Sequence, residues 1–302
     1  MEIALKIASV LLMPLLSHVG PDFAAATEKT LTILKSKTGQ VQQSLRRWFT
    51  MVDDGITFLR DERFESFIED GKLIAPLSSV VLFNKIWQRI ENDCKTIHFP
   101  NTIVWLNGAP GSGKGVNTRN VMRALSISTK PIIVSDLLHT PEFQEKIDKG
   151  LLIDDEEVTY LVFKTIIQGN HNESGVIIDG FPRTTLQAEL LHLLKKRLNS
   201  NTRIISVVLL IDEKTSIARQ RTRGLEAIEH NRLVKSTGRG EFQEVRATDI
   251  DDNIARTRYA TFRDKTIDAL KYLKDFTEYY DIDAKGSFEE VRDRIYAALK
   301  KR

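Results

Sequence analysis

The sequence predicts an α/β protein in which a five-stranded parallel sheet is flanked by helices, preceded by a mainly helical N-terminal region. The main observation is a set of short apolar runs, each typical of a buried strand, at 103–106, 132–134, 175–178, 204–211 and 279–282. Longer helical segments lie between these runs, and a glycine-rich turn directly follows the first of them. Apolar strands that alternate with helices are typical of a parallel sheet covered on both faces.

The helices of this part are expected where apolar side chains recur at helical spacing. They are predicted at 115–125, 155–168, 185–197, 213–222, 252–274 and 288–300. Ligands of such sheets bind beyond the carboxyl ends of the strands. Residues that could carry chemistry should therefore follow the strands directly.

Residues 1–98 are predicted to be a helical extension of unknown role, separated by a short linker from a domain at 102–302. An apolar run at 7–16 is shorter than the roughly 20 residues that span a bilayer, so no transmembrane segment is predicted. Small residues at 24–26 leave a secretory or transit segment open. We expect a cytoplasmic protein, with an organelle-targeted or exported protein as the alternative.

The composition excludes some classes of function. Lys and Arg number 44 against 41 Asp and Glu, a net charge of +3 that is too balanced to indicate a nucleic-acid partner. Cys94 is the single cysteine, so the chain can form neither an internal disulfide nor a cysteine-built zinc site. We expect a monomer that binds no nucleic acid.

The glycine-rich turn matches the G-x-x-x-x-G-K pattern of a phosphate-binding loop. Its glycines let backbone N–H groups surround phosphate oxygens, and Lys114 adds a positive charge near the transferred group. A purely structural glycine turn is the alternative, but the strand before and the helix after the loop favour phosphate binding. The predicted ATP-binding residues here are Gly108, Ala109, Pro110, Gly111, Ser112, Gly113, Lys114, Gly115 and Val116.

A second motif, Asp-Gly-Phe-Pro-Arg-Thr at 179–184, also lies between a predicted strand and a predicted helix. Together with Gly115, which stands where most phosphate loops have a magnesium-binding Ser or Thr, it makes the chain resemble the adenylate kinases over about 102–302. These are P-loop kinases of nucleoside monophosphates. The resemblance implies reversible phosphoryl transfer from MgATP to a nucleoside monophosphate, with AMP favoured because Gln187 lies four residues after Arg183.

The resemblance also implies roles for single residues. Arg183 would clamp the acceptor phosphate, and Asp179 would hold Mg²⁺ through water, although it could instead only cap a turn. Arg219 would lie on the base side of ATP, with a solvated surface arginine as the alternative, and Arg221 is expected to be solvated. The catalytic residues implied are Lys114, Arg183, Arg223, Arg246 and Arg258.

A mobile lid is implied at about 224–245, where glycines and charges replace apolar residues. The acceptor side departs from the family pattern, because Val134, Ser135 and His139 replace a threonine, a glycine and an arginine. A kinase for another monophosphate, or an adenine-nucleotide sensor or scaffold with little turnover, therefore stays open. The acceptor-binding residues implied are Val134, Ser135, His139, Gly180, Arg183 and Gln187.

Overall fold

The computed structural model describes residues 67–69, 72–138, 143, 153–169, 175–198 and 201–300. The chain divides into two compact units, one formed by Met1–Lys85 with Leu193–Lys196 and the other by Ile86–His192 with Arg197–Arg302. The predicted helices before residue 67 lie outside the described residues. The division at residues 85 and 86 falls earlier than the linker at 98–101 that the sequence indicates.

The described part of the first unit is small. Strands β1 (Ile68–Glu69) and β2 (Lys72–Leu73) form an antiparallel pair. Helix α5 (Leu77–Asp93) begins in this unit, where Phe83 packs edge-on against Phe67 with ring centroids 5.5 Å apart.

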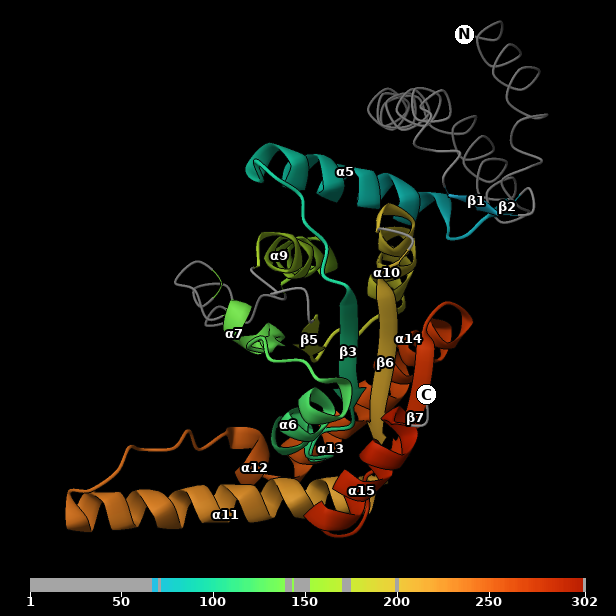
Figure 1. Ribbon diagram of the computed structural model, residues 1–302. Helices are drawn as coiled ribbons and strands as arrows, with labels where there is room; N and C mark the ends of the chain where they lie inside the picture. The colour runs from blue at the N-terminus through green and yellow to red at the C-terminus, as the bar shows by residue number, and fades with distance from the viewer. Residues whose placement is uncertain are drawn as a thin grey trace, which may run out of the picture. The chain divides into compact units, whose positions relative to one another are not determined.

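The second unit contains the five-stranded parallel sheet that the sequence predicts (Figure 1). Its strands are β3 (Thr102–Gly108), β4 (Ile132–Ile133), β5 (Val176–Asp179), β6 (Arg203–Leu210) and β7 (Glu278–Asp283). They run in the order β4-β5-β3-β6-β7, with every neighbouring pair parallel. The central strand β3 is buried on both faces, because helices cover both sides of the sheet.

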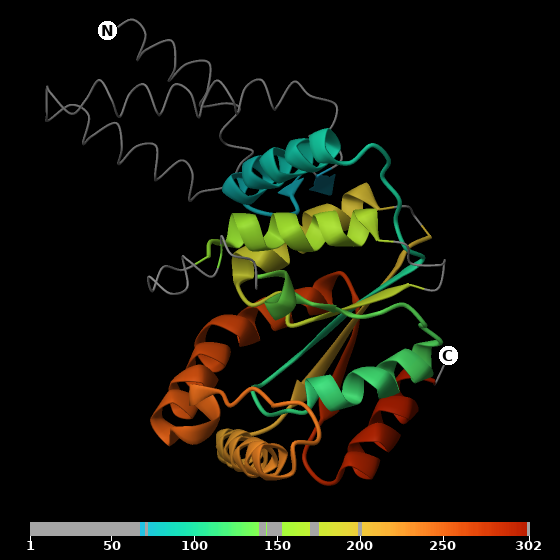
Figure 2. The same cartoon turned by 90° about the vertical axis from the view of Figure 1, so that its left-hand side faces the viewer.

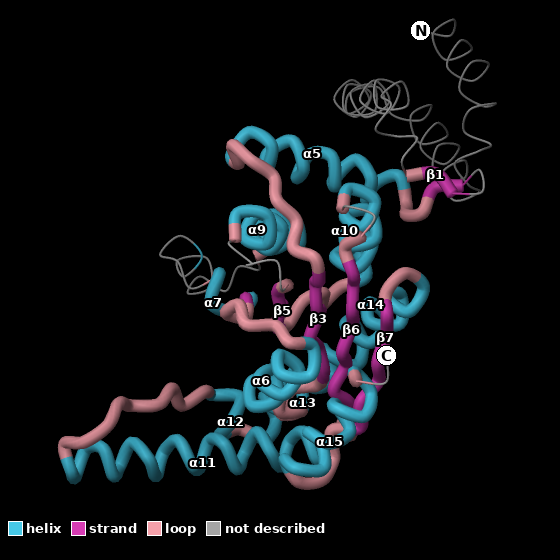
Figure 3. Tube along the Cα trace, viewed as in Figure 1, coloured by secondary structure: helices cyan, strands magenta, loops and turns pink. Residues whose placement is uncertain are grey.

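Helices surround this sheet (Figures 2 and 3). Their bounds are α6 (Lys114–Leu125), α7 (Val134–Leu137), α9 (Asp155–Gln168), α10 (Thr185–Arg197), α11 (Glu213–Thr237), α12 (Ala247–Ile250), α13 (Asp252–Thr261), α14 (Ile267–Tyr272) and α15 (Phe288–Leu299). Short polar side chains start several of them: Asp154 accepts the Glu157 N–H at α9, and Asp212 accepts the Thr215 N–H at α11. A π-helix at Phe262–Thr266 joins α13 to α14.

Helix α11 is longer than the sequence predicts. The prediction ended it at residue 222, but it continues through Gly224 to Thr237 and occupies much of the segment expected to be a lid. Gly224 serves close packing here, because a Cβ atom at this position would lie 2.3 Å from the Asp249 carbonyl oxygen. The chain then returns beside the helix, where the Asn231 side chain exchanges hydrogen bonds with the backbone of Gln243 at 2.7 and 2.8 Å.

Candidate functional site

The phosphate-binding loop lies at the carboxyl end of β3, where the sequence places it. Gly108 packs so closely against the neighbouring strand β6 that there is no room for a side chain. A Cβ atom at this position would lie 2.4 Å from the Leu209 carbonyl oxygen. Gly113, in the left-handed region with φ 84°, starts α6. The buried Ser112 hydroxyl has no hydrogen-bond partner among the described residues, which suits a loop that receives phosphate oxygens.

Lys114 folds back over this loop. Its ammonium donates to the carbonyl oxygens of Gly108 at 2.9 Å and Ala109 at 3.2 Å. Burial lowers the pKa of Lys114 to about 8, against the opposing effect of Asp179 and with the help of the cations Arg183, Arg258 and Arg223. A lysine whose charge is destabilised by its surroundings gains strongly from an incoming anion.

The motif at 179–184 forms a second loop beside the first. Gly180 N–H donates to the Leu106 carbonyl of β3 at 3.0 Å, and the Arg183 Nε donates to the Gly180 carbonyl at 2.8 Å. Burial lowers the pKa of Arg183, and Asp179 opposes this effect. Because a guanidinium stays protonated at any physiological pH, Arg183 offers a fixed positive charge to an anion.

Side chains hold this second loop in place. The Gln187 amide oxygen accepts the Arg183 backbone N–H at 2.7 Å, and its amide nitrogen donates to Asp155 Oδ1 at 2.8 Å. Thr184 donates to the other oxygen of Asp155, also at 2.8 Å. Gln187 is buried, with 4% of its surface exposed, and keeps one N–H and one lone pair beyond these two bonds.

Three further arginines face the same space from the last third of the chain. Arg223 on α11 makes a two-pronged pair with Asp249, at 2.7 and 2.6 Å. The pKa of Arg258 on α13 is lowered by burial and then by the neighbouring charges of Arg223, Arg246 and Arg183. The structure thus brings Lys114, Arg183, Arg223 and Arg258 into one cluster of positive charge. Arg246 lies near Arg258, but it is exposed and pairs with Glu244 at 2.9 Å.

Asp136 is an acidic residue of the site to which the sequence analysis gives no role. Burial raises the pKa of Asp179, Lys114 and Arg183 oppose this, and the nearby carboxylate of Asp136 raises it further. Asp136 lies in the first turn of α7, whereas the sequence analysis assigns roles only to its neighbours Val134, Ser135 and His139. Its place after a strand, at the same edge of the sheet as Asp179, was the available signal.

A buried asparagine was also missed. Asn107, the next-to-last residue of β3, donates to the Pro182 carbonyl at 2.6 Å and accepts the Gly108 N–H at 2.8 Å. It therefore ties the phosphate loop to the loop that carries Arg183. A single polar residue at the end of an apolar strand run gave no specific signal.

Comparison with known proteins agrees with this geometry. The family model described as "Adenylate kinase" matches residues 106–278, more than half of the chain. The chain belongs to the adenylate kinase family. The adenylate kinase of Elusimicrobium minutum is 31% identical over 211 residues, which cover 64% of this chain and 96% of that protein. The adenylate kinase of Archaeoglobus fulgidus is 30% identical over 213 residues, with the same coverage.

Among solved structures, a gluconokinase from Sinorhizobium meliloti 1021 matches with a TM-score of 0.40 and 17% identity, covering 67% of this chain and 93% of that one. Membership of the adenylate kinase family makes the chain a nucleoside monophosphate kinase, a phosphotransferase that binds ATP. None of the helices in the described part of the chain has the length and apolar character that a bilayer span requires.

The remaining predicted residues are placed as follows. Arg219 donates to the carbonyl oxygens of Ala284 at 2.8 Å and Gly286 at 2.9 Å, and it lies beside Gly111 of the phosphate loop. Val134 is buried at the start of α7, with 2% of its surface exposed, and Ser135 follows it. His139 lies outside the described residues, so its role stays a prediction.

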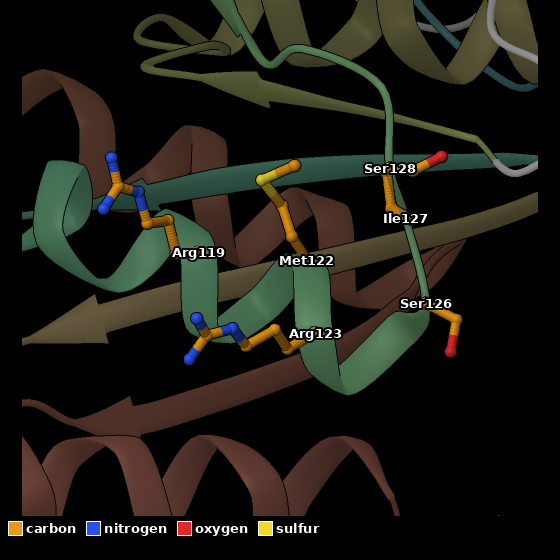
Figure 4. A pocket seen from close by; sticks show the side chains of 6 residues that line it. All are labelled: Arg119, Met122, Arg123, Ser126, Ile127 and Ser128. Carbon is orange, nitrogen blue, oxygen red and sulfur yellow. The ribbon is translucent and has the colours of Figure 1, made fainter.

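A shallow pocket elsewhere contains none of the predicted site residues (Figure 4). It lies along the carboxyl-terminal half of α6 and the turn that follows. Its lining consists of Arg119, Met122, Arg123, Ser126, Ile127 and Ser128. Since the cationic cluster lies at the opposite end of the same helix, this pocket has no part in the phosphate site.

Proposed function

We propose that the protein catalyses reversible transfer of the terminal phosphoryl group of MgATP to AMP, giving two molecules of ADP. The observation that carries this proposal is that Arg183, Arg223 and Arg258 gather near Lys114 of the glycine-rich loop, with Arg246 near Arg258. Two nucleotides that exchange a phosphoryl group bring many negative charges together. A site that binds only one nucleotide has no need of so many cations in one place.

The donor side would bind ATP through the backbone of the loop and through Lys114. The loop N–H groups and the amino terminus of α6 bind the phosphates, and Lys114 leaves the Gly108 and Ala109 carbonyls for a phosphate oxygen. Arg219 lies beside the loop, held by the two carbonyls after β7, in a place that suits contact with the base.

The acceptor side would bind AMP between Arg183 and the β4–α7 segment. An oxygen of the AMP phosphate attacks the terminal phosphorus of ATP, the bond from this phosphorus to the bridging oxygen breaks, and ADP leaves with the electron pair. The attacking oxygen is already anionic, so the reaction needs no general base. Arg183, Arg223 and Arg258 neutralise the charge that spreads over the oxygens of the migrating group.

The donor set also fits a magnesium ion. Mg²⁺ prefers hard oxygen ligands and usually keeps several waters together with substrate phosphates. Burial is the main cause of the raised pKa of Asp179, and the nearby carboxylate of Asp136 adds to it. A divalent cation at this place would favour the charged form of both carboxylates. The described residues contain no group of three or more candidate metal ligands, so phosphates and water would complete the shell. When bound, the ion would neutralise phosphate charge.

A coupled assay with MgATP and each of AMP, dAMP, CMP, UMP and GMP tests the proposal. We expect turnover with AMP at least tenfold above that with CMP, UMP or GMP, because the amide of Gln187 keeps one donor and one acceptor for a base. Preference for another monophosphate would move the proposal to that substrate. Tight ATP binding without turnover on any acceptor would favour a sensor or scaffold instead.

A further inference from the structure

Part of helix α5 that precedes the family match belongs to the same compact unit as the catalytic site. Residues 86–93 end α5, whereas the family model begins at residue 106. Nothing in the adenylate kinase reaction requires a helix at this position. Its contacts with α9 therefore need another explanation.

A cluster of polar contacts joins the end of α5 to α9. Arg89 donates to Glu157 Oε1 at 2.6 Å, and its guanidinium lies 3.6 Å from the centroid of the Tyr160 ring. The Asp93 carboxylate accepts from the Tyr160 hydroxyl and, at 2.9 Å, from Lys164. Hydrogen bonds from Tyr160 and Lys164 lower the pKa of Asp93, so the carboxylate stays charged.

These contacts cover three successive turns of one face of α9, at positions 157, 160 and 164. Such spacing fixes both the rotation and the axial position of a helix. An isolated exposed ion pair contributes little to stability. Here the Arg89 guanidinium also stacks on Tyr160, and the Asp93 carboxylate is shared by Tyr160 and Lys164, so the contacts form a network.

We call the contacts of Arg89 and Asp93 with α9 the clamp. Asp155, the first residue of α9, connects this clamp to the loop that carries Arg183. Asp155 binds Thr184 and Gln187, and Gln187 in turn accepts the backbone N–H of Arg183. Glu157 is only two positions after Asp155 on this helix. A shift or rotation of α9 would therefore move the loop that presents Arg183 to the acceptor phosphate.

We propose that Arg89 and Asp93, at the end of the N-terminal extension, are positioning residues for the acceptor-nucleotide site, acting through α9 and Asp155. The expected change in the KM for AMP rests on the proposed phosphoryl transfer to a monophosphate. The phosphate loop is held by the backbone of β3 and β6 and by α6, and a shift of α9 reaches it through the Asn107 bond to Pro182. Arg89 and Asp93 thus set acceptor affinity and leave ATP affinity nearly unchanged.

The test is the double variant Arg89→Ala/Asp93→Ala compared with Gln88→Ala/Asn92→Ala, which truncates two exposed side chains one position earlier on the same helix. Two readouts are taken: steady-state kinetics with ATP and AMP varied in turn, and hydrogen exchange of the backbone amides. We expect the KM for AMP to rise about three- to tenfold with KM for ATP unchanged. Exchange should quicken in 155–168 and 180–187 and not in the phosphate loop.

Charge exchange provides a rescue for the case in which the double variant unfolds. Arg89→Glu alone should raise the KM for AMP, and Arg89→Glu with Glu157→Arg should restore much of the loss. Unchanged exchange in 155–187 overturns the positioning role whether or not the protein turns over AMP. Wild-type protein that turns over no monophosphate would overturn the proposed function alone, since the exchange experiment still decides on the clamp.

Discussion

The proposed donor half of the site is held by backbone hydrogen bonds, whereas the proposed acceptor half is held by side-chain hydrogen bonds. The phosphate loop is held by backbone bonds, such as Ala109 N–H to the Leu209 carbonyl at 3.3 Å and Ser112 N–H to the Ala109 carbonyl at 3.1 Å. The acceptor loop depends on the side chains of Asp155, Thr184 and Gln187. Backbone groups are the same whatever the residue, whereas a side-chain network changes with every substitution.

This difference indicates which side of the site is more sensitive to amino-acid substitutions. On the proposed donor side, the backbone N–H of Val116 stays available to a phosphate whatever its side chain is. On the proposed acceptor side, Val134, Ser135 and His139 depart from the family pattern that the resemblance implies. We therefore expect ATP binding to resemble that of the relatives and acceptor binding to be where this protein differs.

The largest effect is expected from Lys114→Ala. It removes a charge on the migrating phosphoryl group, so kcat should fall about 10³-fold. The change lies on the donor side, and we expect it to affect every acceptor equally. Lys130→Ala, an exposed lysine after α6, is the matched control. Near-wild-type turnover in a folded Lys114→Ala protein would contradict the assignment of the loop.

Arg183→Gln probes the acceptor side with a smaller effect. Loss of a charge-assisted contact with the acceptor phosphate should lower kcat/KM for AMP about 10²-fold and change the KM for ATP little. Arg221→Gln serves as the control, because Arg221 is exposed and has only a 3.5 Å pair with Asp252. An equal rise in both Michaelis constants would mean that Arg183 does not distinguish the two halves.

The sheet, and a glycine-rich loop between β3 and α6, were predictable from the sequence for physical reasons that are local. Buried parallel strands are apolar throughout, and a glycine pattern between strand and helix has few other uses. The end of α11 was not predictable in this way, because Gly224 looks like a helix breaker until Asp249 is seen against it. Likewise, the apolar spacing of residues 86–90 indicates a helix without saying which unit it packs against.

Pairings distant in the chain were also beyond the sequence. Asp155 stands 29 residues before Thr184, and its hydrogen bond to that side chain exists only in the fold. Asn107 and Pro182 are 75 residues apart. The roles of the named site residues, His139 included, stay predictions.

The pH dependence of the donor side should be moderate. The pKa of Lys114 is about 8 in the fold against 10.5 for an ordinary lysine, so the nucleotide-free protein loses this charge above pH 8. We expect kcat/KM for ATP to fall roughly tenfold per pH unit beyond that point, while kcat stays level because bound phosphates keep the lysine protonated. Measurements from pH 7 to 10 check this.

Two further results bear on the same lysine. Lys114→Arg should flatten the profile, because a guanidinium does not titrate in this range. Between pH 8 and 10.5 the unfolded chain binds more protons at this residue than the fold does, so its contribution to the free energy of unfolding rises with pH. A kcat/KM for ATP that stays constant to pH 10 would show that Lys114 is not the group that governs ATP capture.

The smallest kinetic effect is expected at Asn107, where the two halves are joined. Asn107→Leu leaves the Gly108 N–H and the Pro182 carbonyl without this partner, and each buried group left unsatisfied costs about 1–3 kcal/mol. We expect the free energy of unfolding to fall by about 2–4 kcal/mol. Turnover should fall a few-fold, because the spacing between the two loops is no longer fixed.

Ser206→Ala separates these two consequences. Ser206 is fully buried on the neighbouring strand and accepts a hydrogen bond from Thr277 at 2.9 Å, away from both loops. Its loss should lower stability and leave turnover unchanged. Denaturant unfolding and steady-state kinetics on both variants make the comparison. If Asn107→Leu loses stability with kcat and both Michaelis constants intact, then Asn107 only stabilises the fold, and the donor and acceptor loops keep their distance through the parallel pairing of β3 with β5 alone.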